Sequence, residues 1–335
     1  MSEKVGKNKF LNKSETNEDM IGLSIRPKKL ENFIGQSSLK KNLDTFIKSS
    51  LKRKKSLDHI IFYGPPGLGK TTLASIVAFE KNVNIHISSG PAFSKKGDLV
   101  TLLSNLSEGD ILFIDEIHRL SPVIEETLYP AMEDFKCDYI IGAGPSARIM
   151  QLSIEKFTLI GATTRLGLLS RPLRDRFGIP LQINFYDPQD LKIIVKQVAE
   201  SLKTSISEMG SYEIAIRSRG TPRIAIRILK RIIDFATVKG LQKIEQEIVK
   251  ESLNDLKIDN LGLDEMDRRL ILTIADNFNG GPVGIENLSA ALLEQKDIIE
   301  DVVEPYLIQQ GLIQRTSRGR VLSKKGLEHL KKING

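Results

Sequence analysis

Several residue types are scarce in this chain, and their scarcity excludes whole classes of protein. The 335 residues include one cysteine, Cys137, and no tryptophan. A single cysteine cannot form an internal disulfide, so the fold depends on packing and suits a reducing compartment. No run of about 18 apolar residues is present that could span a bilayer. We therefore expect a cytoplasmic protein without a membrane segment.

The N-terminal segment is poor in apolar residues, with Phe10 and Leu11 isolated among Lys, Asn, Glu and Ser. Because it lacks the apolar core of a secretory signal peptide, we interpret residues 1–20 as a polar tail. The four histidines show no spacing typical of metal ligands, and we expect no zinc site. We interpret Cys137 as a small, partly buried residue.

Positive charge is in excess, and most of it lies at one end of the chain. Of the formal net charge of +7, the last 25 residues carry +6, from seven Lys or Arg side chains and one acid, Glu328. Such a local concentration favours a polyanion such as nucleic acid. A basic tail that only aids solubility is the alternative, and charge alone does not separate the two.

A glycine-rich segment, Gly64-Pro65-Pro66-Gly67-Leu68-Gly69-Lys70-Thr71-Thr72, fits the phosphate-binding pattern G-x-x-x-x-G-K-[ST]. It lies between a predicted strand, Ile60–Tyr63, and a predicted helix that runs to Ala78. A strand that ends in glycines and opens a helix surrounds a triphosphate with backbone N–H groups. We therefore predict that this loop binds ATP, that Lys70 reaches the β- and γ-phosphates, and that the Thr71 hydroxyl holds Mg²⁺.

Strand-like and helix-like segments alternate along the first half of the chain. The apolar runs typical of buried strands are Ile60–Tyr63, Ile85–Ser88, Ile111–Ile114, Phe157–Ile160 and Leu181–Phe185. Alternation of this kind predicts an α/β domain, over residues 21–186, in which helices cover both faces of a parallel sheet. From Asp190 to Leu256 only helical spacing remains, which predicts a small helical domain over residues 187–257.

A third domain is predicted over residues 260–335. We expect helices near Asp264–Asp276, Gly284–Leu293 and Ile298–Gln310, the last of which ends at Gly311. Two short apolar runs then flank Ser317-Arg318-Gly319 and predict a hairpin. Three helices and a basic hairpin resemble a winged helix, a fold that usually contacts duplex DNA.

Two acids, Asp115 and Glu116, end the apolar run Ile111–Ile114. At the carboxyl end of a strand beside a phosphate loop, such a pair is typical of the second half of an ATPase site. Asp115 would organise the Mg²⁺ shell, and Glu116 would orient and polarise the attacking water. An ordinary acidic strand end is the alternative, but coupling to Lys70 favours catalysis.

Other polar side chains also follow predicted strands or open predicted helices. Thr164 comes after the run Phe157–Ile160 and either senses the γ-phosphate or only caps a helix. Three arginines lie within the six residues from Arg171 to Arg176, and one of them could stabilise charge on a neighbouring subunit's phosphate. Spacing alone does not say which arginine does so. Arg223 opens a helix and could reach the same phosphates.

Together these segments resemble the AAA+ ATPases and, within them, the RuvB family of Holliday-junction branch-migration motors. The resemblance covers about Ile25 to Arg320, and its C-terminal block is what narrows it to this family. The matching segments are the phosphate loop, Ile114–Arg119, Gly161–Arg165, Pro172–Gly178, Gly220–Arg223, Gly280–Gly284, Glu304–Gly311 and Arg315–Arg320.

The resemblance assigns roles that spacing leaves open. It implies that Thr164 is the first sensor, that Arg223 is the second sensor, and that Arg176 is the catalytic finger acting in trans, with Arg174 a weaker candidate. It also implies a set of further nucleotide-contacting residues. They are Ile25, Arg26, Gly67, Gly69, Thr72, Glu133, Asp134, Phe135 and Tyr186.

The resemblance further implies partners. Arg315, Arg318 and Arg320 would contact double-stranded DNA at four-way junctions, and the protein would act as a homo-hexameric ring. A predicted hairpin at residues 138–152 would dock on a RuvA-type junction-binding protein, and a RuvC-type resolvase would join a larger complex. A hairpin that only covers its own domain is the alternative.

Three rival functions remain. A clamp loader uses the same ATP site as a switch, but that family ends in a helical collar rather than a basic winged helix. A protein unfoldase needs an aromatic-apolar-glycine pore loop, and here Phe93 stands alone. A nucleotide-gated DNA-binding regulator would hydrolyse ATP slowly or not at all, and Glu116 with the arginine cluster weighs against it.

Overall fold

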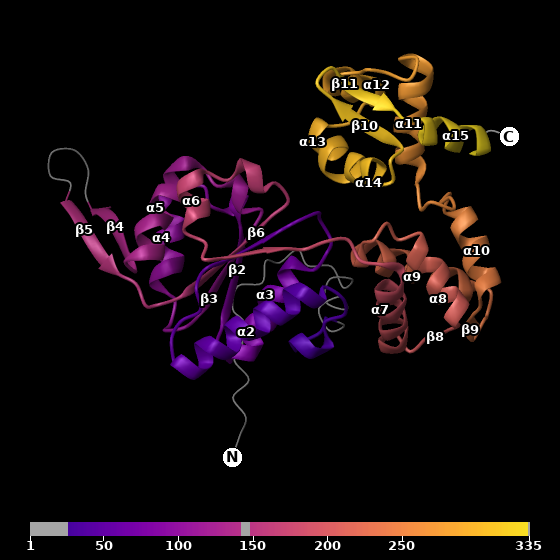
Figure 1. Cartoon of the computed structure of the whole chain (residues 1–335). Helices are drawn as coiled ribbons and strands as arrows, with labels where there is room; N and C mark the ends of the chain where they lie inside the picture. The colour runs from indigo at the N-terminus through magenta and orange to yellow at the C-terminus, as the bar shows by residue number, and fades with distance from the viewer. Residues whose placement is uncertain (1–25, 142–147, 334–335) are drawn as a thin grey trace.

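Three bodies follow one another along the chain (Figure 1). The computed structural model describes residues 26–141 and 148–333, so the predicted tail at residues 1–20 and Ile25 lie outside the described residues. We call the three bodies the sheet domain, the helical domain and the winged-helix domain. In the described ranges, no helix has the length and apolar character needed to cross a membrane.

The centre of the sheet domain is a parallel sheet of five strands in the order β2-β3-β6-β1-β7. The strands are β1 (Ile60–Tyr63), β2 (Ile85–Ser89), β3 (Ile111–Asp115), β6 (Thr158–Thr163) and β7 (Ile179–Gln182). Since β3 and β6 are neighbours and β6 pairs with β1, the ends of three strands meet at one edge. At this edge lie the phosphate loop after β1, the acid pair at the end of β3, and Thr164 after β6.

Helices cover both faces of this sheet, as the sequence predicts. They are α2 (Ser37–Arg53), α3 (Lys70–Lys81), α4 (Lys96–Ser104), α5 (Pro122–Glu133) and α6 (Arg171–Asp175). Alternate strand residues point to opposite faces. Thus Phe113 packs in one core with α2 and α3, whereas Leu112 and Ile114 pack in a second core with α4 and α5.

In the described residues, four single-turn segments and a hairpin complete the sheet domain. The turns are η1 (Leu30–Asn32), η2 (Gly90–Ala92), η3 (Ile117–Arg119) and η5 (Leu166–Leu168). Strands β4 (Lys136–Ile141) and β5 (Arg148–Ser153) form the predicted antiparallel hairpin, which projects from the domain (Figure 1). Cys137 is buried at its base, where burial raises the pKa of the thiol.

The helical domain consists of four helices. They are α7 (Pro188–Ser201), α8 (Glu208–Ile216), α9 (Pro222–Val238) and α10 (Gln246–Asp255). The prediction that no strand occurs here is wrong in detail, because β8 (Ser205–Ile206) pairs with β9 (Lys243–Ile244). Two residues per strand are too few to leave a period-2 apolar signal.

The winged-helix domain packs its helices and hairpin around its own core. Its elements are α11 (Glu265–Asn277), α12 (Ile285–Leu292), α13 (Lys296–Ile298), the π-helical segment η6 (Ile299–Val303), α14 (Glu304–Gln309), β10 (Ile313–Thr316), β11 (Gly319–Leu322) and α15 (Lys324–Ile333). The helix predicted at Ile298–Gln310 is therefore α13, η6 and α14 in succession. Gly311 ends it with φ +67°, which favours glycine.

The last strand of the sheet is also displaced from its prediction. It was expected at Leu181–Phe185 and lies at Ile179–Gln182. The Ile183 N–H still donates to the Tyr63 carbonyl at 2.8 Å, after which the chain leaves the sheet for the helical domain. Phe185 therefore packs at the junction of two domains rather than in the sheet. The sequence does not separate these two positions, because an apolar side chain is expected in both.

Candidate nucleotide-binding and hydrolysis site

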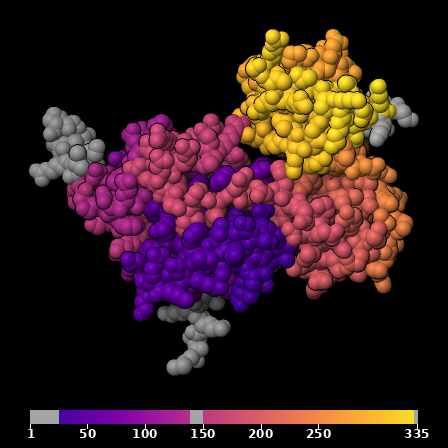
Figure 2. All heavy atoms as spheres, in the orientation of Figure 1, coloured from indigo at the N-terminus to yellow at the C-terminus, as the bar shows by residue number. Residues whose placement is uncertain are grey.

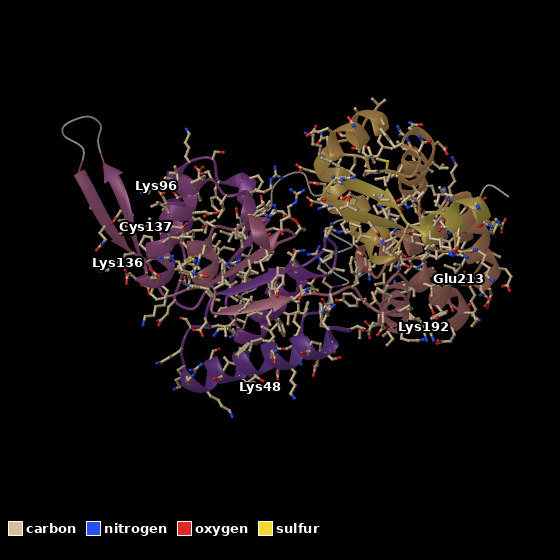
Figure 3. All side chains as sticks on the ribbon, turned by 45° about the horizontal axis from the view of Figure 1, so that its top comes forward. Lys48, Lys96, Lys136, Cys137, Lys192 and Glu213 are labelled. Carbon is tan, nitrogen blue, oxygen red and sulfur yellow. The ribbon has the colours of Figure 1, made fainter. Side chains whose placement is uncertain are left out.

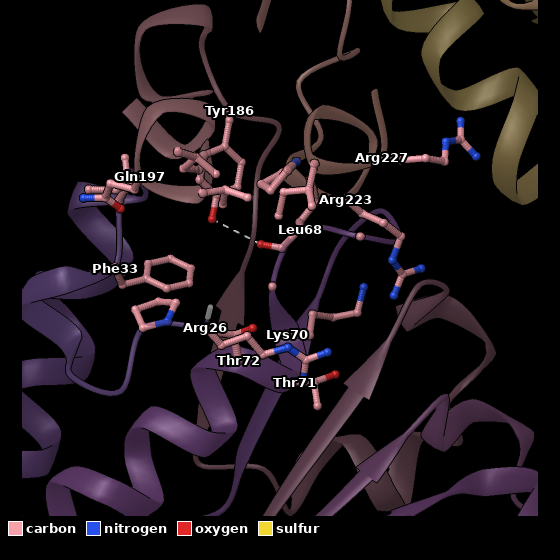
Figure 4. A pocket seen from close by; sticks show the side chains of 18 of the residues that line it. Arg26, Phe33, Leu68, Lys70, Thr71, Thr72, Tyr186, Gln197, Arg223 and Arg227 are labelled. Carbon is pink, nitrogen blue, oxygen red and sulfur yellow. Dashed lines mark hydrogen bonds between the residues drawn. The ribbon is translucent and has the colours of Figure 1, made fainter. Parts of the chain in front are cut away.

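A cavity of about 770 Å³ lies between the sheet domain and the helical domain. Its walls include the phosphate loop, the end of β3, and one face each of α7 and α9. The lining side chains shown in Figure 4 come from both domains (Figure 4). Cavities of this size at a domain boundary are where small-molecule ligands usually bind.

The phosphate loop owes its shape to glycines at positive φ. Gly64 has φ +146°, and a Cβ there would lie 2.3 Å from the Ile183 carbonyl oxygen. Gly67 has φ +78°, and a Cβ there would meet Thr221 at 2.9 Å and Arg223 at 3.0 Å. A side chain is excluded at both positions, so the backbone N–H groups at the start of α3 can approach a ligand closely.

Lys70 is buried in the cavity wall and its side chain is already positioned. Its ammonium donates to the carbonyls of Gly64 at 2.8 Å and Pro65 at 2.9 Å. Burial lowers the pKa of Lys70, while the carboxylates of Glu116 and Asp115 oppose that shift. A cation held within its own loop is ready to exchange carbonyl oxygens for phosphate oxygens.

Asp115 and Glu116 line the same cavity as Lys70, Thr71 and Thr72. Asp115 is the last residue of β3, and its Oδ1 accepts a hydrogen bond from the Glu116 N–H at 3.0 Å. Glu116 has φ +47°, a left-handed conformation that is costly for a residue with a Cβ. The chain therefore leaves the extended conformation of β3 at Glu116.

A small polar network holds the Glu116 carboxylate. Its Oε2 accepts a hydrogen bond from the Thr164 hydroxyl at 3.3 Å and lies 3.2 Å from His118 Nδ1. The same His118 nitrogen lies 2.9 Å from the Thr163 hydroxyl. Burial lowers the pKa of His118, so its ring is neutral at neutral pH. The sequence analysis missed His118, because only the turn η3 brings it beside Glu116.

The opposite wall carries aromatic and cationic side chains (Figure 4). The Tyr186 hydroxyl donates to the Leu68 carbonyl at 3.2 Å, which joins the domain boundary to the phosphate loop. Burial raises the pKa of Tyr186, so it stays a phenol. Arg26 and Arg223 also line the cavity, and the Arg223 N–H donates to the Gly67 carbonyl at 3.4 Å. Phe33, Gln197 and Ile226 line it as well.

Arg176 is absent from this cavity and lies at the C-terminal end of α6. Its guanidinium contacts Glu133 at 3.0 Å, the Pro172 carbonyl at 2.7 Å and the face of Tyr129, 4.4 Å from the ring centroid. Glu133, Asp134 and Phe135 lie outside the cavity too, at the C-terminal end of α5. These four residues are therefore separated from the chain's own phosphate loop.

Models of known protein families match nearly the whole chain. Residues 25–183 match the Holliday junction DNA helicase RuvB P-loop domain, residues 186–259 the RuvB AAA lid domain, and residues 260–331 the RuvB C-terminal winged helix domain. This chain belongs to the RuvB family.

Solved RuvB structures are similar along nearly their entire length. The Thermotoga maritima RuvB Holliday junction branch migration motor is 48% identical, with a TM-score of 0.85, over 92% of this chain and 98% of that chain. A point mutant of the same protein is 47% identical, with a TM-score of 0.86, over 91% of this chain and 98% of that chain. As in other AAA+ proteins of the RuvB family, the fold is a P-loop sheet domain, a lid and a winged helix.

The winged-helix domain places the three predicted DNA contacts in different settings. Arg318 lies exposed in the two-residue turn between β10 and β11. Arg315 is half-exposed and pairs with Glu304 at 2.5 Å. Arg320 is only 7% exposed, and its guanidinium pairs with Glu304 at 2.6 Å and Glu300 at 2.7 Å. The carboxylates of Glu304 and Glu300 therefore occupy donors of the Arg320 guanidinium, and the DNA contact of Arg320 stays a prediction.

Two observations bear on the rival functions in this RuvB-family chain. Phe93 is buried in the second core of the sheet domain, so it cannot serve as the exposed aromatic of an unfoldase pore loop. The C-terminal domain is a winged helix instead of a helical collar, which is not the architecture expected of a clamp loader.

In the described part of the chain, no cluster of three or more His, Cys, Asp or Glu side chains could hold a metal ion.

Proposed function

We propose that this protein hydrolyses ATP to drive branch migration of Holliday junctions. The observation that carries the proposal is the shared cavity of Lys70, Asp115 and Glu116 in a chain whose three domains match the RuvB family. Binding of a nucleotide follows from the P-loop domain itself. The domain boundaries predicted above, 21–186, 187–257 and 260–335, are part of this proposal.

Residues of the cavity divide the chemistry among them. Lys70 exchanges the Gly64 and Pro65 carbonyls for β- and γ-phosphate oxygens. Glu116 accepts the proton of the attacking water, and Thr164, which already donates to it, orients the water and the γ-phosphate. Tyr186 lies beside the adenine, and Arg26 and Arg223 contact the nucleotide from the cavity wall that also carries Tyr186.

The donor set at the end of β3 fits Mg²⁺. A threonine hydroxyl and a carboxylate, those of Thr71 and Asp115, line the cavity next to the lysine, and oxygen ligands are the ones Mg²⁺ prefers. When bound, the ion neutralises charge between the β- and γ-phosphates. Asp115 holds its own orientation through the hydrogen bond from the Glu116 N–H.

The face around Arg176 completes the site of a neighbouring subunit. Arg176 lies outside its own cavity and close to Glu133, so we assign Arg176, Glu133, Asp134 and Phe135 to the edge that meets the next subunit's nucleotide. This arrangement requires a ring, and we propose a homo-hexamer around duplex DNA. The exposed hairpin arginine, Arg318, and the half-exposed Arg315 contact DNA phosphates without reading sequence.

We assign the partners to the remaining surfaces. The predicted hairpin at residues 138–152, of which the structure describes strands β4 and β5, extends from the sheet domain with Lys136 and Cys137 at its base (Figure 3). It docks on a RuvA-type junction-binding protein, while a RuvC-type resolvase joins the larger complex. The protein acts in the cytoplasm on nucleoid DNA.

The test is ATP-dependent dissociation of a synthetic four-way junction, with and without a RuvA-type partner. We expect dissociation that requires ATP and is lost in Glu116→Gln. Hydrolysis without strand movement, even with the partner, would contradict the motor and favour a nucleotide switch. Binding of ATP without turnover under the same conditions would favour a regulator.

A further inference from the structure

The helical and winged-helix domains are joined through a buried arginine. The Arg219 side chain is 8% exposed, and its Nε donates to the Gly262 carbonyl at 2.7 Å. Its Nη2 pairs with Asp264 at 2.8 Å and with Asp267, and the guanidinium lies 5.6 Å from the centre of the Tyr306 ring. Since breaking a buried ion pair of this kind is costly, we expect the two domains to move as one body.

Several contacts join this body to the sheet domain, and two of them bear on its movement. One is the junction at Tyr186, whose N–H donates to the Gly220 carbonyl at 2.8 Å. The other is Arg165, which donates to Asp301 at 2.6 Å and Asp297 at 3.3 Å on the winged-helix domain. The space-filling view shows the winged-helix domain resting against both other domains (Figure 2). Any rotation about the Tyr186 junction must therefore move or break the Arg165 contact.

Arg165 is connected to the hydrolysis site by its backbone. It directly follows Thr164, and its N–H donates to the Thr163 hydroxyl at 3.0 Å. That hydroxyl lies 2.9 Å from His118, which in turn contacts the Glu116 carboxylate at 3.2 Å. A change in what Glu116 and Thr164 bind therefore acts on the residues that hold Arg165.

On the other side of the contact, the acidic partners belong to the segment that supports the wing. Asp301 lies in η6, and so does Glu300, which pairs with Arg320 at 2.7 Å and Arg315 at 3.4 Å. Glu300 and Asp301 are adjacent in sequence and face different domains. A shift of η6 therefore moves the base of the DNA-facing hairpin.

We propose that the ion pairs of Arg165 with Asp301 and Asp297, here called the domain latch, couple the nucleotide state to the position of the winged-helix domain. The proposal rests on the proposed function. The γ-phosphate draws the Thr164 hydroxyl from Glu116, the end of β6 moves, and the latch opens. Because coupling between two binding sites is reciprocal, duplex DNA at the wing changes nucleotide affinity by the same factor.

The test measures the dissociation constant of the full chain for a duplex, with ADP and with a non-hydrolysable ATP analogue. We expect wild-type constants that differ about 5-fold or more, the lower end of typical coupling. In Asp301→Asn with Asp297→Asn, the two constants become equal. The matched control, Glu286→Gln, removes an exposed ion pair with Lys296 in the same domain and keeps the wild-type ratio.

Exchange of the charges adds a second, independent test. In Arg165→Asp alone, the dissociation constants for the duplex with ADP and with the ATP analogue become equal. Arg165→Asp combined with Asp301→Arg restores part of the difference, which loss of folding could not do. A wild-type ratio of 1, or a ratio unchanged in the asparagine variant, overturns the latch. These binding measurements do not depend on strand movement, so an inactive wild type in the junction assay would reject the motor while the ratio still decides the latch.

Discussion

The nucleotide cavity and the face around Arg176 both present charged groups that suit phosphate chemistry, but they differ in how complete they are. The cavity combines Lys70, Asp115, Glu116 and Arg223 from one chain. The Arg176 guanidinium instead rests on Glu133 and Tyr129 of its own surface. We therefore expect one chain to suffice for nucleotide binding, whereas the proposed role of Arg176 makes fast hydrolysis depend on a second chain.

The strongest way to break this comparison is Arg176→Ala. We expect ATP affinity to be retained and hydrolysis to fall by about 10³–10⁵-fold, as for other trans-acting arginines. Lys70→Ala should lose both binding and hydrolysis. When the two inactive variants are mixed, subunit interfaces with an intact cavity and an intact finger form, and steady-state hydrolysis returns. If the mixture stays inactive, the finger does not act in trans.

Within the cavity, the variant Glu116→Gln tests the assignment of Glu116 as the general base. Loss of the general base should lower the single-turnover rate about 10²–10⁴-fold. The isosteric amide keeps the cavity's shape, so nucleotide affinity measured by fluorescence titration should change little. A wild-type rate would show that another group activates the water.

A second comparison, within the winged-helix domain, is between the buried Arg320 and the exposed Arg318. Arg320→Ala leaves Glu304, whose side chain is fully buried, with Arg315 as its remaining partner. We expect the free energy of unfolding to fall by about 3 kcal/mol, the lower limit for a broken buried pair. Urea denaturation checks this, and the exposed Arg318→Ala serves as control, with a change within about 0.5 kcal/mol. Equal losses would contradict the assignment of Arg320 to the interior.

The smallest effect is expected from the same exposed arginine on DNA. Arg318→Ala should reduce the slope of log K against log salt for duplex binding by about 1, equally for unrelated sequences. Lys48→Ala, on α2 of the sheet domain and well away from the winged helix in Figure 3, should leave the slope unchanged. A sequence-dependent loss would indicate base contacts instead of phosphate contacts.

Most of the nucleotide cavity could be predicted because its residues lie in short, contiguous motifs at strand ends. The phosphate loop, Asp115 and Glu116 each come directly after an apolar run, and a parallel sheet brings such ends together. The roles assigned to these residues remain predictions until they are measured. Residues such as Phe33 and Gln197 carry no comparable signal, since only the packing of two domains brings them to the cavity.

Long-range pairing is what the sequence could not supply. Arg320 lies in a basic run, and its neighbours suggest an exposed charge, yet its partners Glu300 and Glu304 come from the preceding helix. Likewise, nothing near Arg165 indicates Asp301, 136 positions later. Local charge therefore indicated a basic segment, but it did not show which of its arginines is exposed and which is paired in the interior.

The π-helical segment η6 restricts which sequence changes related proteins can accept. A π turn holds one residue more than an α turn, so a deletion or an insertion here changes which residues of the segment lie on each side of the helix. Asp301 and Glu304 would then no longer face the sheet domain and the wing at the same time. We expect related sequences to keep acidic residues at the positions of Glu300 and Asp301 and to lack insertions and deletions within this segment.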